Sequence, residues 1–486
     1  MNLALFLPEL ILAGFAVLVV LLDLVLQQKD WLRLVSLAGL VIAGGVTAAM
    51  WGGAYPAIFN GLLAVDGFAL FFKFIFLGVA FLVILASTDY ISRMARFQGE
   101  YYALILLAAL GMMLMAATAD LISIYIALEL TSISLYALGA FLKDARSTEA
   151  SLKYLLLGAL ASAVLLYGMA LVFGFTGATR LGEIAQVVQS MSPQALLASP
   201  ALLAGIGLMV AGFGFKIAAV PFQMWVPDVY EGAPTTITAY LSVASKAAGF
   251  AVVLRVFLSA FGGSAWLGGY WGTIFAVLAV ISMTLGNVLA IPQANIKRML
   301  GYSSIAQAGY LMVGLAAAGV GAVSGALGQN GVLFFLASYA LTNIGAFIAI
   351  IAISNKVNSD MIADYAGAGK RSPLLALALT LCLISLIGMP PAAGFMAKFY
   401  IFSAAVQEGL LWLVVIAVLN SVISAYYYLR VVKVMWFGEA ASPEEVPSSP
   451  SLRLALFVSC LGVLLLGIVP GLVMRLAEMA ANMLAF

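Results

Sequence analysis

Apolar runs of about 20 residues follow one another along almost the whole chain, separated by short clusters of turn-forming or charged residues. At ~1.5 Å per helical residue, such a run matches the ~30 Å hydrocarbon thickness of a bilayer. The pattern therefore predicts an all-α polytopic membrane protein with about 14 transmembrane helices. Their expected limits are 4–26, 31–51, 64–88, 101–117, 120–141, 149–175, 199–231, 234–260, 268–291, 298–319, 329–353, 373–406, 409–437 and 452–480.

Two of these runs are too long for one straight span, the seventh at 199–231 and the twelfth at 373–406. Proline lies inside each of them, Pro221 in the first and Pro390–Pro391 in the second. Proline removes a backbone hydrogen bond and clashes with the preceding helical turn. We therefore expect helices seven and twelve to be broken.

The two broken helices are five spans apart, which suggests that helices four to eight and nine to thirteen are repeats. An odd number of spans in each repeat would give the two repeats opposite orientations in the membrane. Inverted repeats with broken helices at the midplane are the usual architecture of ion-coupled transporters. The expected segments are 1–100 with three N-terminal helices, 101–260 and 268–437 with one five-helix repeat each, and 438–486 with a loop and the last helix.

Basic residues distinguish the two sides of the predicted bundle. Cytoplasmic loops of membrane proteins carry an excess of lysine and arginine. The odd-numbered loops hold Lys29, Arg33, Arg93, Arg96, Lys143, Arg146, Lys297, Arg298, Lys356, Lys370, Arg371 and Arg453, and the even-numbered loops hold essentially one, Arg180. We expect the odd loops in the cytoplasm and both termini on the opposite side. The seventh loop is an exception, with Asp228 and Glu231 and no basic residue.

Composition argues against a redox group on this chain. The sequence is 65% hydrophobic and 9% charged, against ~25% charged residues in soluble proteins. Because it has no histidine, and because Cys382 and Cys460 lie far apart in apolar runs, histidine-held haem is excluded and zinc or iron–sulfur sites are not expected. It has no GxGxxG motif or phosphate-binding loop, and its net charge of +2 without a basic stripe argues against nucleic acid binding. Residues 1–26 lack a basic n-region and a cleavage site, which predicts a retained helix.

Four ionisable residues lie deep inside otherwise apolar spans: Glu129, Lys216, Lys246 and Lys398. A charge near the bilayer centre costs at least ~2.5–3.5 kcal/mol, so such residues usually face a polar pathway. Burial disfavours the charged form of a lysine, which turns a permanent charge into a switchable proton carrier. Glu129 is interpreted as a gate that pairs with Lys216, with a structural ion pair as the alternative. Snorkelling to an interface is the alternative for the three lysines.

Other charged and polar residues in the spans give weaker signals. Lys73 is a less favoured functional candidate. Glu149 and Lys153 form an i,i+4 pair that indicates a membrane-edge ion pair or, alternatively, a channel entrance. Three arginines near span ends, Arg255, Arg430 and Arg475, are expected to snorkel, and Tyr426, Tyr427 and Tyr428 to pack or to sit in the interfacial belt. In helix ten the uncharged side chains of Ser303, Ser304, Gln307 and Tyr310 are expected to hold water that conducts protons.

Four segments in this order, FKIAAVPFQMWVPDVYEGAPT, SVASKAAGF, NIKRMLGYSSIAQAGY and GFMAKFY, resemble the subunit N (subunit 2) family of respiratory complex I, the proton-translocating NADH:quinone oxidoreductase. The wider family is that of antiporter-like subunits, shared with multisubunit sodium/proton antiporters. The resemblance implies 14 helices with inverted five-helix repeats. It also implies roles for Glu129 as gating acid, Lys216 as paired lysine, Lys246 as central lysine and Lys398 as output lysine.

Details of the motifs favour subunit N over its relatives. Lysine at Lys398 argues against the related subunit M, which has glutamate there, and the absence of a long lateral arm argues against subunit L. Family members often carry histidine in helix ten where this chain has Gln307, so water would have to substitute for a titrating side chain.

The resulting hypothesis is a proton-translocating membrane-arm subunit in the inner (plasma) membrane, driven by quinone reduction elsewhere in the complex. NADH, FMN, iron–sulfur clusters and quinone are expected in other subunits, with neighbouring membrane subunits and the lipid bilayer as partners. In the favoured mechanism a charge change breaks the pairing of Glu129 with Lys216, and a proton then passes through Lys246 to Lys398. The alternatives are a subunit of a sodium/proton antiporter and a scaffold with vestigial charges.

Overall fold

The computed structural model describes residues 3–53, 55–91, 97–321, 325–439 and 449–481. Regular structure in these residues is helical, apart from isolated β-bridges such as that between Asp120 and Arg180. Thirteen helices in this part of the chain are long and apolar enough to cross a membrane, and the shorter apolar helix Pro373–Ile387 belongs to a fourteenth span. The predicted fold class is confirmed.

The N-terminal helices are η1 (Leu3–Phe6, a 3₁₀ turn), α1 (Leu7–Val25), α2 (Asp30–Ala49), α3 (Gly67–Ala86) and α4 (Thr88–Ile91). They are followed by α5 (Gln98–Ala117), α6 (Leu121–Gly139), α7 (Ala145–Thr176), α8 (Leu181–Gln189), α9 (Pro193–Leu197), α10 (Pro200–Ile217), α11 (Trp225–Gly232), α12 (Thr235–Tyr240), the π-helical turn η2 (Leu241–Ser245) and α13 (Lys246–Phe261). The remaining helices are α14 (Ala265–Ala290), α15 (Ile296–Val320), α16 (Gly325–Val357), η3 (Ile362–Tyr365), α17 (Ala368–Arg371), α18 (Pro373–Ile387), α19 (Ala393–Gln407), α20 (Leu411–Phe437), α21 (Pro450–Ile468) and α22 (Gly471–Ala481).

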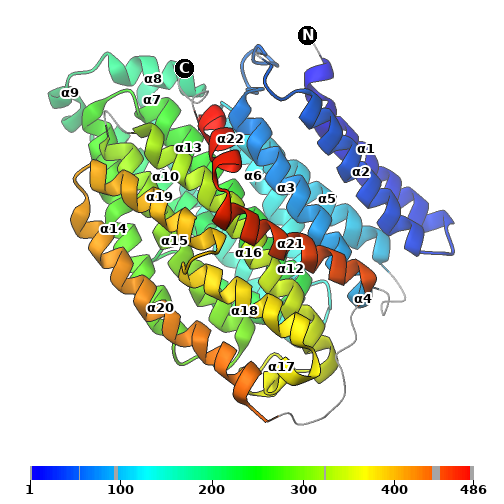
Figure 1. Ribbon diagram of the computed structural model, residues 1–486. Coiled ribbons are helices and arrows are strands. Elements are labelled where there is room, and N and C mark those ends of the chain that lie inside the picture. The colour runs from blue at the N-terminus through cyan, green and yellow to red at the C-terminus, as the bar shows by residue number, and fades with distance from the viewer. Residues whose placement is uncertain (1–2, 54, 92–96, 322–324, 440–448, 482–486) are drawn as a thin grey trace.

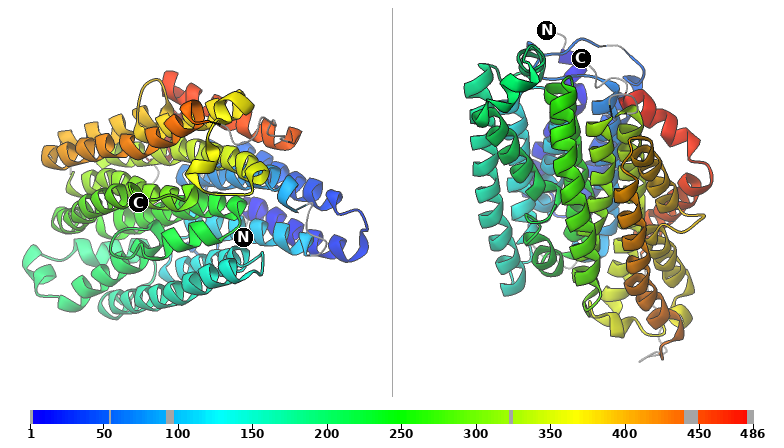
Figure 2. Two further views of the ribbon diagram at one scale, coloured as in Figure 1. Left: turned by 90° about the horizontal axis from the view of Figure 1, so that it is seen from below. Right: turned by 90° about the vertical axis from the view of Figure 1, so that its left-hand side faces the viewer.

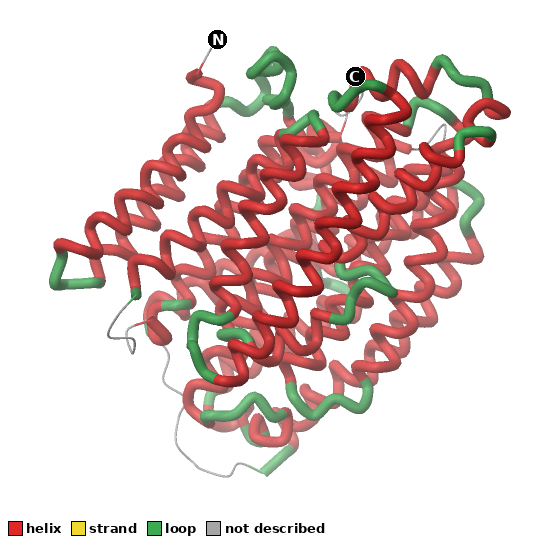
Figure 3. The backbone as a smooth tube through the Cα atoms, turned by 180° about the vertical axis from the view of Figure 1, so that it is seen from behind, coloured by secondary structure: helices red, strands yellow, loops and turns green. Residues whose placement is uncertain are grey.

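The helices run side by side across one bundle, with most loops at its two ends (Figures 1 and 3). The pair α1–α2 lies at one edge of the bundle, and α8 and α9 lie at the same end as the start of α1 (Figures 1 and 2). The span α12–α13 and helices α15 and α16 form its centre, because about nine-tenths of their residues are buried, against a third in α1, α2 and α7. The centre is therefore where a charged side chain is furthest from solvent and lipid headgroups.

Short polar side chains begin several spans. Asp66, Asp120 and Asp144 accept hydrogen bonds from backbone N–H groups in the first turns of α3, α6 and α7, at 2.7–3.0 Å. Asn295 does the same for α15. These caps satisfy donors that have no partner inside a helix, and they fix where each span starts.

Both predicted helix breaks are present. Helix α10 ends at Ile217 and α11 begins at Trp225, while α18 ends at Ile387 and α19 begins at Ala393. Each first half ends on a residue with left-handed backbone, Ala218 (φ 61°) and Gly388 (φ 91°). That conformation terminates a helix, and the prolines that follow prevent it from resuming at once.

Two expectations from the sequence were wrong in detail, and helix eight has an irregularity that the sequence did not indicate. The last span, expected as one helix over 452–480, is divided into α21 and α22, since Pro470 cannot continue a helix. Arg255 does not snorkel: it is fully buried and makes two 2.8 Å bonds to the Asp66 carboxylate, which caps α3. Helix eight is not a regular α-helix, because η2 interrupts it directly before Lys246.

The arrangement of the loops predicts opposite accessibility for two exposed positions. Lys356 ends α16 next to the eleventh loop, and Gln194 lies in α9 in the sixth loop. With Cys382 and Cys460 replaced by alanine, Lys356→Cys is expected to react with a membrane-impermeant maleimide only from the cytoplasmic side, and Gln194→Cys only from the other. Reaction of both from one side would refute the span count, and reaction with the two sides exchanged would refute the orientation alone.

Candidate functional site

Glu129 lies at the middle of α6 on the boundary between the bundle and its surroundings. Its carboxylate is half-buried and accepts a hydrogen bond from the Ser162 hydroxyl of α7. Ile126 and Ile133, one turn to either side on the same helix, are both 62% exposed. Of the four predicted site residues, Glu129 is therefore the one that faces the outer surface of this chain.

Lys216 lies in the last turn of α10, directly before the first helix break, and is buried. Its ammonium donates to the Ser132 hydroxyl at 2.6 Å, and Ser132 lies one turn after Glu129 on α6. No ion pair joins Lys216 to Glu129 in the described structure, so the expected pairing is corrected. Lys216 contacts Ser132, one helical turn away from Glu129 on the same helix. Lys216 therefore bonds a neutral oxygen, and the Glu129 carboxylate is hydrogen-bonded by Ser162 instead.

Lys246 begins α13 directly after η2 at the centre of the bundle. A π-helical turn is a local irregularity that often marks functional sites. The ammonium donates to both the carbonyl and the hydroxyl of Ser304 on α15. Two buried tyrosines, Tyr230 and Tyr339, also bond the Ser304 hydroxyl, each at 3.1 Å. Lys246 thus lies in a cluster of hydroxyl groups without a carboxylate partner among the described residues.

Lys398 lies in α19, shortly after the second break, and only 5% of its surface is exposed. Its ammonium donates to the carbonyls of Leu386 (3.4 Å) and Ile387 (2.8 Å) and to the Ser421 hydroxyl (3.0 Å). Those carbonyls end α18, where a helix has unpaired oxygens and partial negative charge. The break therefore provides the oxygens that solvate this lysine.

Helix α15 connects the central and terminal lysines. Ser304 contacts Lys246, and Gln307, one turn further along and about 4.5 Å along the axis, donates to the Leu386 carbonyl at 2.9 Å. The same carbonyl accepts from Lys398. Ser303 adds a hydrogen bond to Tyr428 of α20. The uncharged side chains expected to line this part of helix ten therefore lie between the two lysines.

Lys216 and Lys246 lie on facing helices. Gly249 is one turn after Lys246, and a Cβ at this glycine would lie 3.4 Å from Cβ of Lys216 and 2.9 Å from Ile217. A larger residue would push α10 and α13 apart, so glycine permits this close approach. The structure thus brings Lys216, Lys246 and Lys398 into one row across adjacent helices, with Glu129 at its outer end.

A cavity of about 750 Å³ adjoins Lys398 between α19 and α20. Its lining runs from Ile387 and Lys398 to Gln407 in the last turn of α19, at the end of the bundle that holds the even-numbered loops. The polar side chains in its lining are Lys398, Ser403, Gln407 and Ser421, and the other lining side chains are apolar. Several of its lining side chains, such as Phe399 and Val422, are exposed, so Lys398 lies at the inner wall of a groove that opens on the outer face of the bundle.

Three buried cations outside the row have carboxylate partners, and a fourth, Arg371, donates instead to the Ala366 carbonyl. Lys73 pairs with Glu9 at 2.7 Å, both with about 2% of the side chain exposed, and Arg255 pairs with Asp66. The Lys73 observation favours a structural ion pair over a functional role. Within the described residues Lys216, Lys246 and Lys398 bond neutral oxygens only. This difference distinguishes buried cations with an anionic partner from lysines whose partners are uncharged.

Several polar residues near the row gave no signal in the sequence. Ser132 could have been selected only from its one-turn spacing to Glu129, and Ser162 only from its place on the next helix. Asn343 donates to Ser242 at 2.7 Å, and Asn287 lies fully buried between α15 and α20. Tyr427 and Tyr428 are buried and hydrogen-bonded, so the interfacial belt alternative is wrong for both. No group of three or more Cys, Asp or Glu side chains in the described residues is placed to hold a metal ion.

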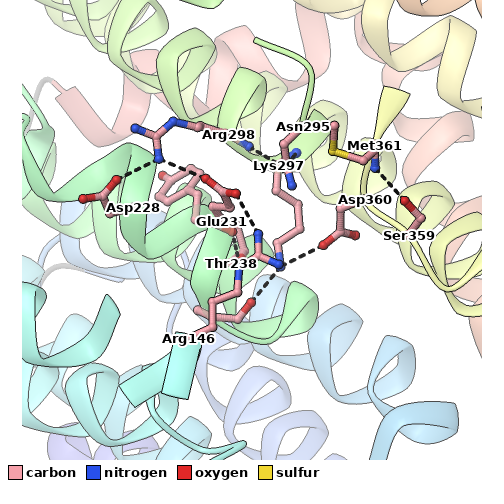
Figure 4. Close-up of polar contacts among 12 residues, drawn as sticks. Arg146, Asp228, Glu231, Thr238, Asn295, Lys297, Arg298, Ser359, Asp360 and Met361 are labelled. Atoms are coloured by element: carbon pink, nitrogen blue, oxygen red, sulfur yellow. Dashed lines mark hydrogen bonds and ion pairs between the residues drawn. The ribbon is translucent and has the colours of Figure 1, made fainter. Parts of the chain in front are cut away.

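A second polar cluster lies where the odd-numbered loops meet (Figure 4). Arg298 at the start of α15 pairs with Asp228 (2.7 Å) and Glu231 (2.9 Å) of α11, and Arg146 of α7 also pairs with Glu231 (2.7 Å). The exceptional acids of the seventh loop are thus partners of basic residues in the fifth and ninth loops. This arrangement places these loops at one end of the bundle.

The same cluster extends to the remaining candidates at this end. Lys153 bonds both Glu149, as its spacing predicted, and Asp228, each at 3.0 Å. Lys297 is buried, donates to the Ala233 carbonyl at 2.8 Å and pairs with Asp360 at 3.5 Å. A polar cavity of about 640 Å³ lies beside Lys297 and Asp360. These contacts join the first expected repeat to the second.

Comparisons with known proteins agree on one family. The family model described as NADH:quinone oxidoreductase/Mrp antiporter, TM, matches residues 117–424. The NADH-quinone oxidoreductase subunit N of Dehalococcoides mccartyi is 50% identical over 482 residues, which cover 99% of each chain. The protein of the same name from Trichlorobacter lovleyi is 46% identical over 489 residues, with 99% of this chain and 98% of the relative covered.

Solved structures show the same fold over nearly the whole chain. A chain of respiratory complex I from Thermus thermophilus with bound Aureothin matches with a TM-score of 0.80 and 35% identity, covering 97% of this chain and 99% of that one. A chain of the membrane-bound sulfane sulfur reductase, an archaeal respiratory membrane complex, matches with a TM-score of 0.87 and 27% identity, covering 98% and 97%. A chain of the Mrp complex from a Dietzia species, at 20% identity and a TM-score of 0.85 with 100% and 98% covered, shares the fold.

The ion pairs in Figure 4 predict how firmly α11 is held. Asp228→Asn removes one partner each of Lys153 and Arg298, and partly exposed pairs contribute up to ~1 kcal/mol. Amide hydrogen exchange in α11 is expected to become about fivefold faster, and less so in 1 M salt because salt screens the remaining pairs. Glu183→Gln, which removes the exposed pair with Arg180 elsewhere, is the control. Unchanged exchange in α11 would show that these pairs do not hold it.

Proposed function

Because this chain belongs to the NADH:quinone oxidoreductase/Mrp antiporter family, and within it to subunit N of NADH-quinone oxidoreductase, we propose that Lys216, Lys246 and Lys398 carry protons across it and that Glu129 is the gating acid. The chain is a multi-pass, proton-translocating membrane-arm subunit of a respiratory complex I. The row of buried lysines is the route by which we expect it to perform that function.

One observation carries this proposal: the three lysines of the row bond neutral oxygens, whereas Lys73 and Arg255 bond carboxylates. An ion pair in a low-dielectric interior is stabilised only while both partners stay charged, and breaking it costs several kcal/mol. A lysine that bonds only hydroxyls and carbonyls breaks no ion pair when it loses its proton. It can release its proton to water or to another amine and keep hydrogen bonds in the neutral state.

The first step of the proposed route uses the charge of Glu129. A proton on Lys216 is stabilised by the carboxylate that lies one turn from its partner Ser132. A change of charge at the outer surface beside Glu129 would weaken this stabilisation. Lys216 would then give its proton to the neutral amine of Lys246 on the facing helix, directly or through water.

The second step runs along α15. The protonated Lys246 donates hydrogen bonds to Ser304. Water between Ser304, Gln307 and the Leu386 carbonyl would carry the proton from Lys246 to Lys398. Gln307 cannot titrate at neutral pH, so water replaces a titrating side chain at this position. Lys398 would release the proton into the cavity that leads towards Gln407.

Orientation and partners complete the proposal. The basic odd loops would lie in the cytoplasm of a bacterial cell and both termini on the other side of the plasma membrane. NADH, FMN, iron–sulfur clusters and quinone would be bound by other subunits, whose redox reaction drives the charge change beside Glu129. A sodium/proton antiporter subunit is the less favoured alternative, because the relatives at 46–50% identity carry the name NADH-quinone oxidoreductase subunit N. Sodium-dependent transport without quinone-linked activity would support it.

The role of Glu129 predicts a loss of transport without loss of assembly. Glu129→Gln keeps an acceptor for Ser162 but removes the negative charge, and proton translocation during quinone reduction is expected to fall about tenfold or more, the effect of ~1.4 kcal/mol. Vesicles that contain the purified complex allow proton uptake and quinone reduction to be measured together. Glu183→Gln is the matched exposed control. Near-normal pumping by an assembled Glu129→Gln complex would rule out the gating role.

The role of Lys246 is tested by separating charge from proton exchange. Lys246→Ala removes the carrier, and Lys246→Arg keeps the charge but cannot release a proton, because a guanidinium stays protonated in proteins. Both variants are expected to lose proton translocation by about a hundredfold, the scale of a lost acid–base group. If the arginine variant pumps like the parent, Lys246 is a fixed charge and the proposed route is wrong.

A further inference from the structure

The contacts of Lys398 match those of an ammonium ion. Three oxygens, those of Leu386, Ile387 and Ser421, accept its three N–H groups, and the Tyr310 ring centroid lies 4.0 Å from Nζ. The face of an aromatic ring attracts a cation and not a neutral amine. A neutral amine also has only two N–H groups. The position of the Tyr310 ring therefore helps to set how firmly Lys398 holds its proton.

Asn287 of α14 holds the Tyr310 hydroxyl, which also interacts with the Ser421 hydroxyl. The Asn287 amide nitrogen donates to the Tyr310 hydroxyl at 3.2 Å. Asn287 is fully buried, and its side-chain oxygen accepts from the Tyr427 hydroxyl at 2.9 Å. Both ends of the amide are therefore in use, which gives the side chain one orientation.

Asn287 also holds the other side of the Lys398 site. Its amide nitrogen lies 3.1 Å from the carbonyl and 3.3 Å from the side-chain oxygen of Asn420 on α20. Asn420 directly precedes Ser421, whose hydroxyl bonds Lys398. One side chain on α14 thus joins the turn of α15 that carries Tyr310 to the turn of α20 that carries Ser421.

We propose that Asn287 is a positioning residue for proton transfer at Lys398, because it holds the Tyr310 ring and the Ser421 hydroxyl in place on the ammonium. The inference rests on the proposed role of Lys398 as the last proton carrier. Asn287 itself exchanges no proton with Lys398. On protonation, the amine forms a third N–H bond with a proton delivered by water, and that bond breaks when the proton passes to water in the adjoining cavity.

The test uses the intact complex in vesicles, with proton translocation and quinone reduction measured together. Asn287→Leu has similar volume and no hydrogen-bonding groups, and Tyr310→Leu removes the ring. Each is expected to lower proton translocation about tenfold, within the range of a lost cation–ring attraction. Tyr310→Phe keeps the ring but loses the bond to Asn287, so a loss of about threefold is expected. Asn330→Leu, at another buried asparagine, on α16, whose side-chain oxygen has no partner in the described residues, is the control and should pump like the parent.

The double variant separates positioning from packing. If Asn287 acts through Tyr310 and Ser421, Asn287→Leu should cause a smaller loss in a Tyr310→Leu complex than in the parent, because the ring is already absent and only the contact with the turn of Ser421 remains to be lost. A purely structural role would lower assembly and thermal stability, and its losses in the two variants would multiply. Multiplying losses, or normal pumping by Asn287→Leu, would overturn the inference. If the Asn287→Leu complex does not assemble, normal pumping by the Tyr310→Phe complex would overturn the inference.

Lys398→Ala distinguishes this inference from the proposed function. If Lys398→Ala pumps normally, Lys398 is not a carrier and the proposed route fails, together with the inference that rests on it. If Lys398→Ala stops translocation while Asn287→Leu leaves it unchanged, the route stands and only the role of Asn287 is refuted.

Discussion

The structure depends on how a cationic nitrogen is solvated inside a bundle that excludes water. Two solutions occur in the described residues. Lys73 and Arg255 lie against carboxylates, and the resulting ion pairs join α1 to α3 and α13 to α3. Lys216, Lys246 and Lys398 lie instead against hydroxyls and carbonyls. Because a carboxylate partner fixes the charged state, only the second solution suits residues that must gain and lose protons.

Backbone oxygens supply part of this neutral solvation, and the end of a helix offers carbonyls that have no partner within the helix. The second helix break provides them, because it leaves the carbonyls at the end of α18 without partners inside the helix. Lys398 and Gln307 occupy those carbonyls. At the first break, Trp225 bonds the Phe215 carbonyl at 3.0 Å, and the Ser282 hydroxyl accepts from the Val220 N–H at 2.9 Å. The two breaks therefore differ in use: the first is closed by its neighbours, and the second holds a lysine.

The sequence predicted the spans, the two breaks and the buried lysines because each depends on a local property: run length, proline inside a run, or charge inside a run. It did not predict which side chains meet. These helices are apolar on nearly every side, so periodicity does not define how each one is rotated. That rotation decides why Lys216 contacts Ser132 and not Glu129, and why Arg255 is buried against Asp66. It also decides that Asn287 contacts both α15 and α20. An asparagine in an apolar run also has no charge to mark it.

The positions of the four residues suggest where a driving force can act. Glu129 is half-buried at the outer face of α6, whereas the three lysines are enclosed by this chain's own helices. A charge outside the chain can therefore reach Glu129 with little screening by intervening protein, but it reaches Lys246 and Lys398 only through Lys216 and α15. At one end of the bundle, Arg298 joins α15 to α11, the second half of the broken helix whose first half carries Lys216. In the proposed route both connections therefore meet at α15, the helix that lies between the central lysine and the terminal one.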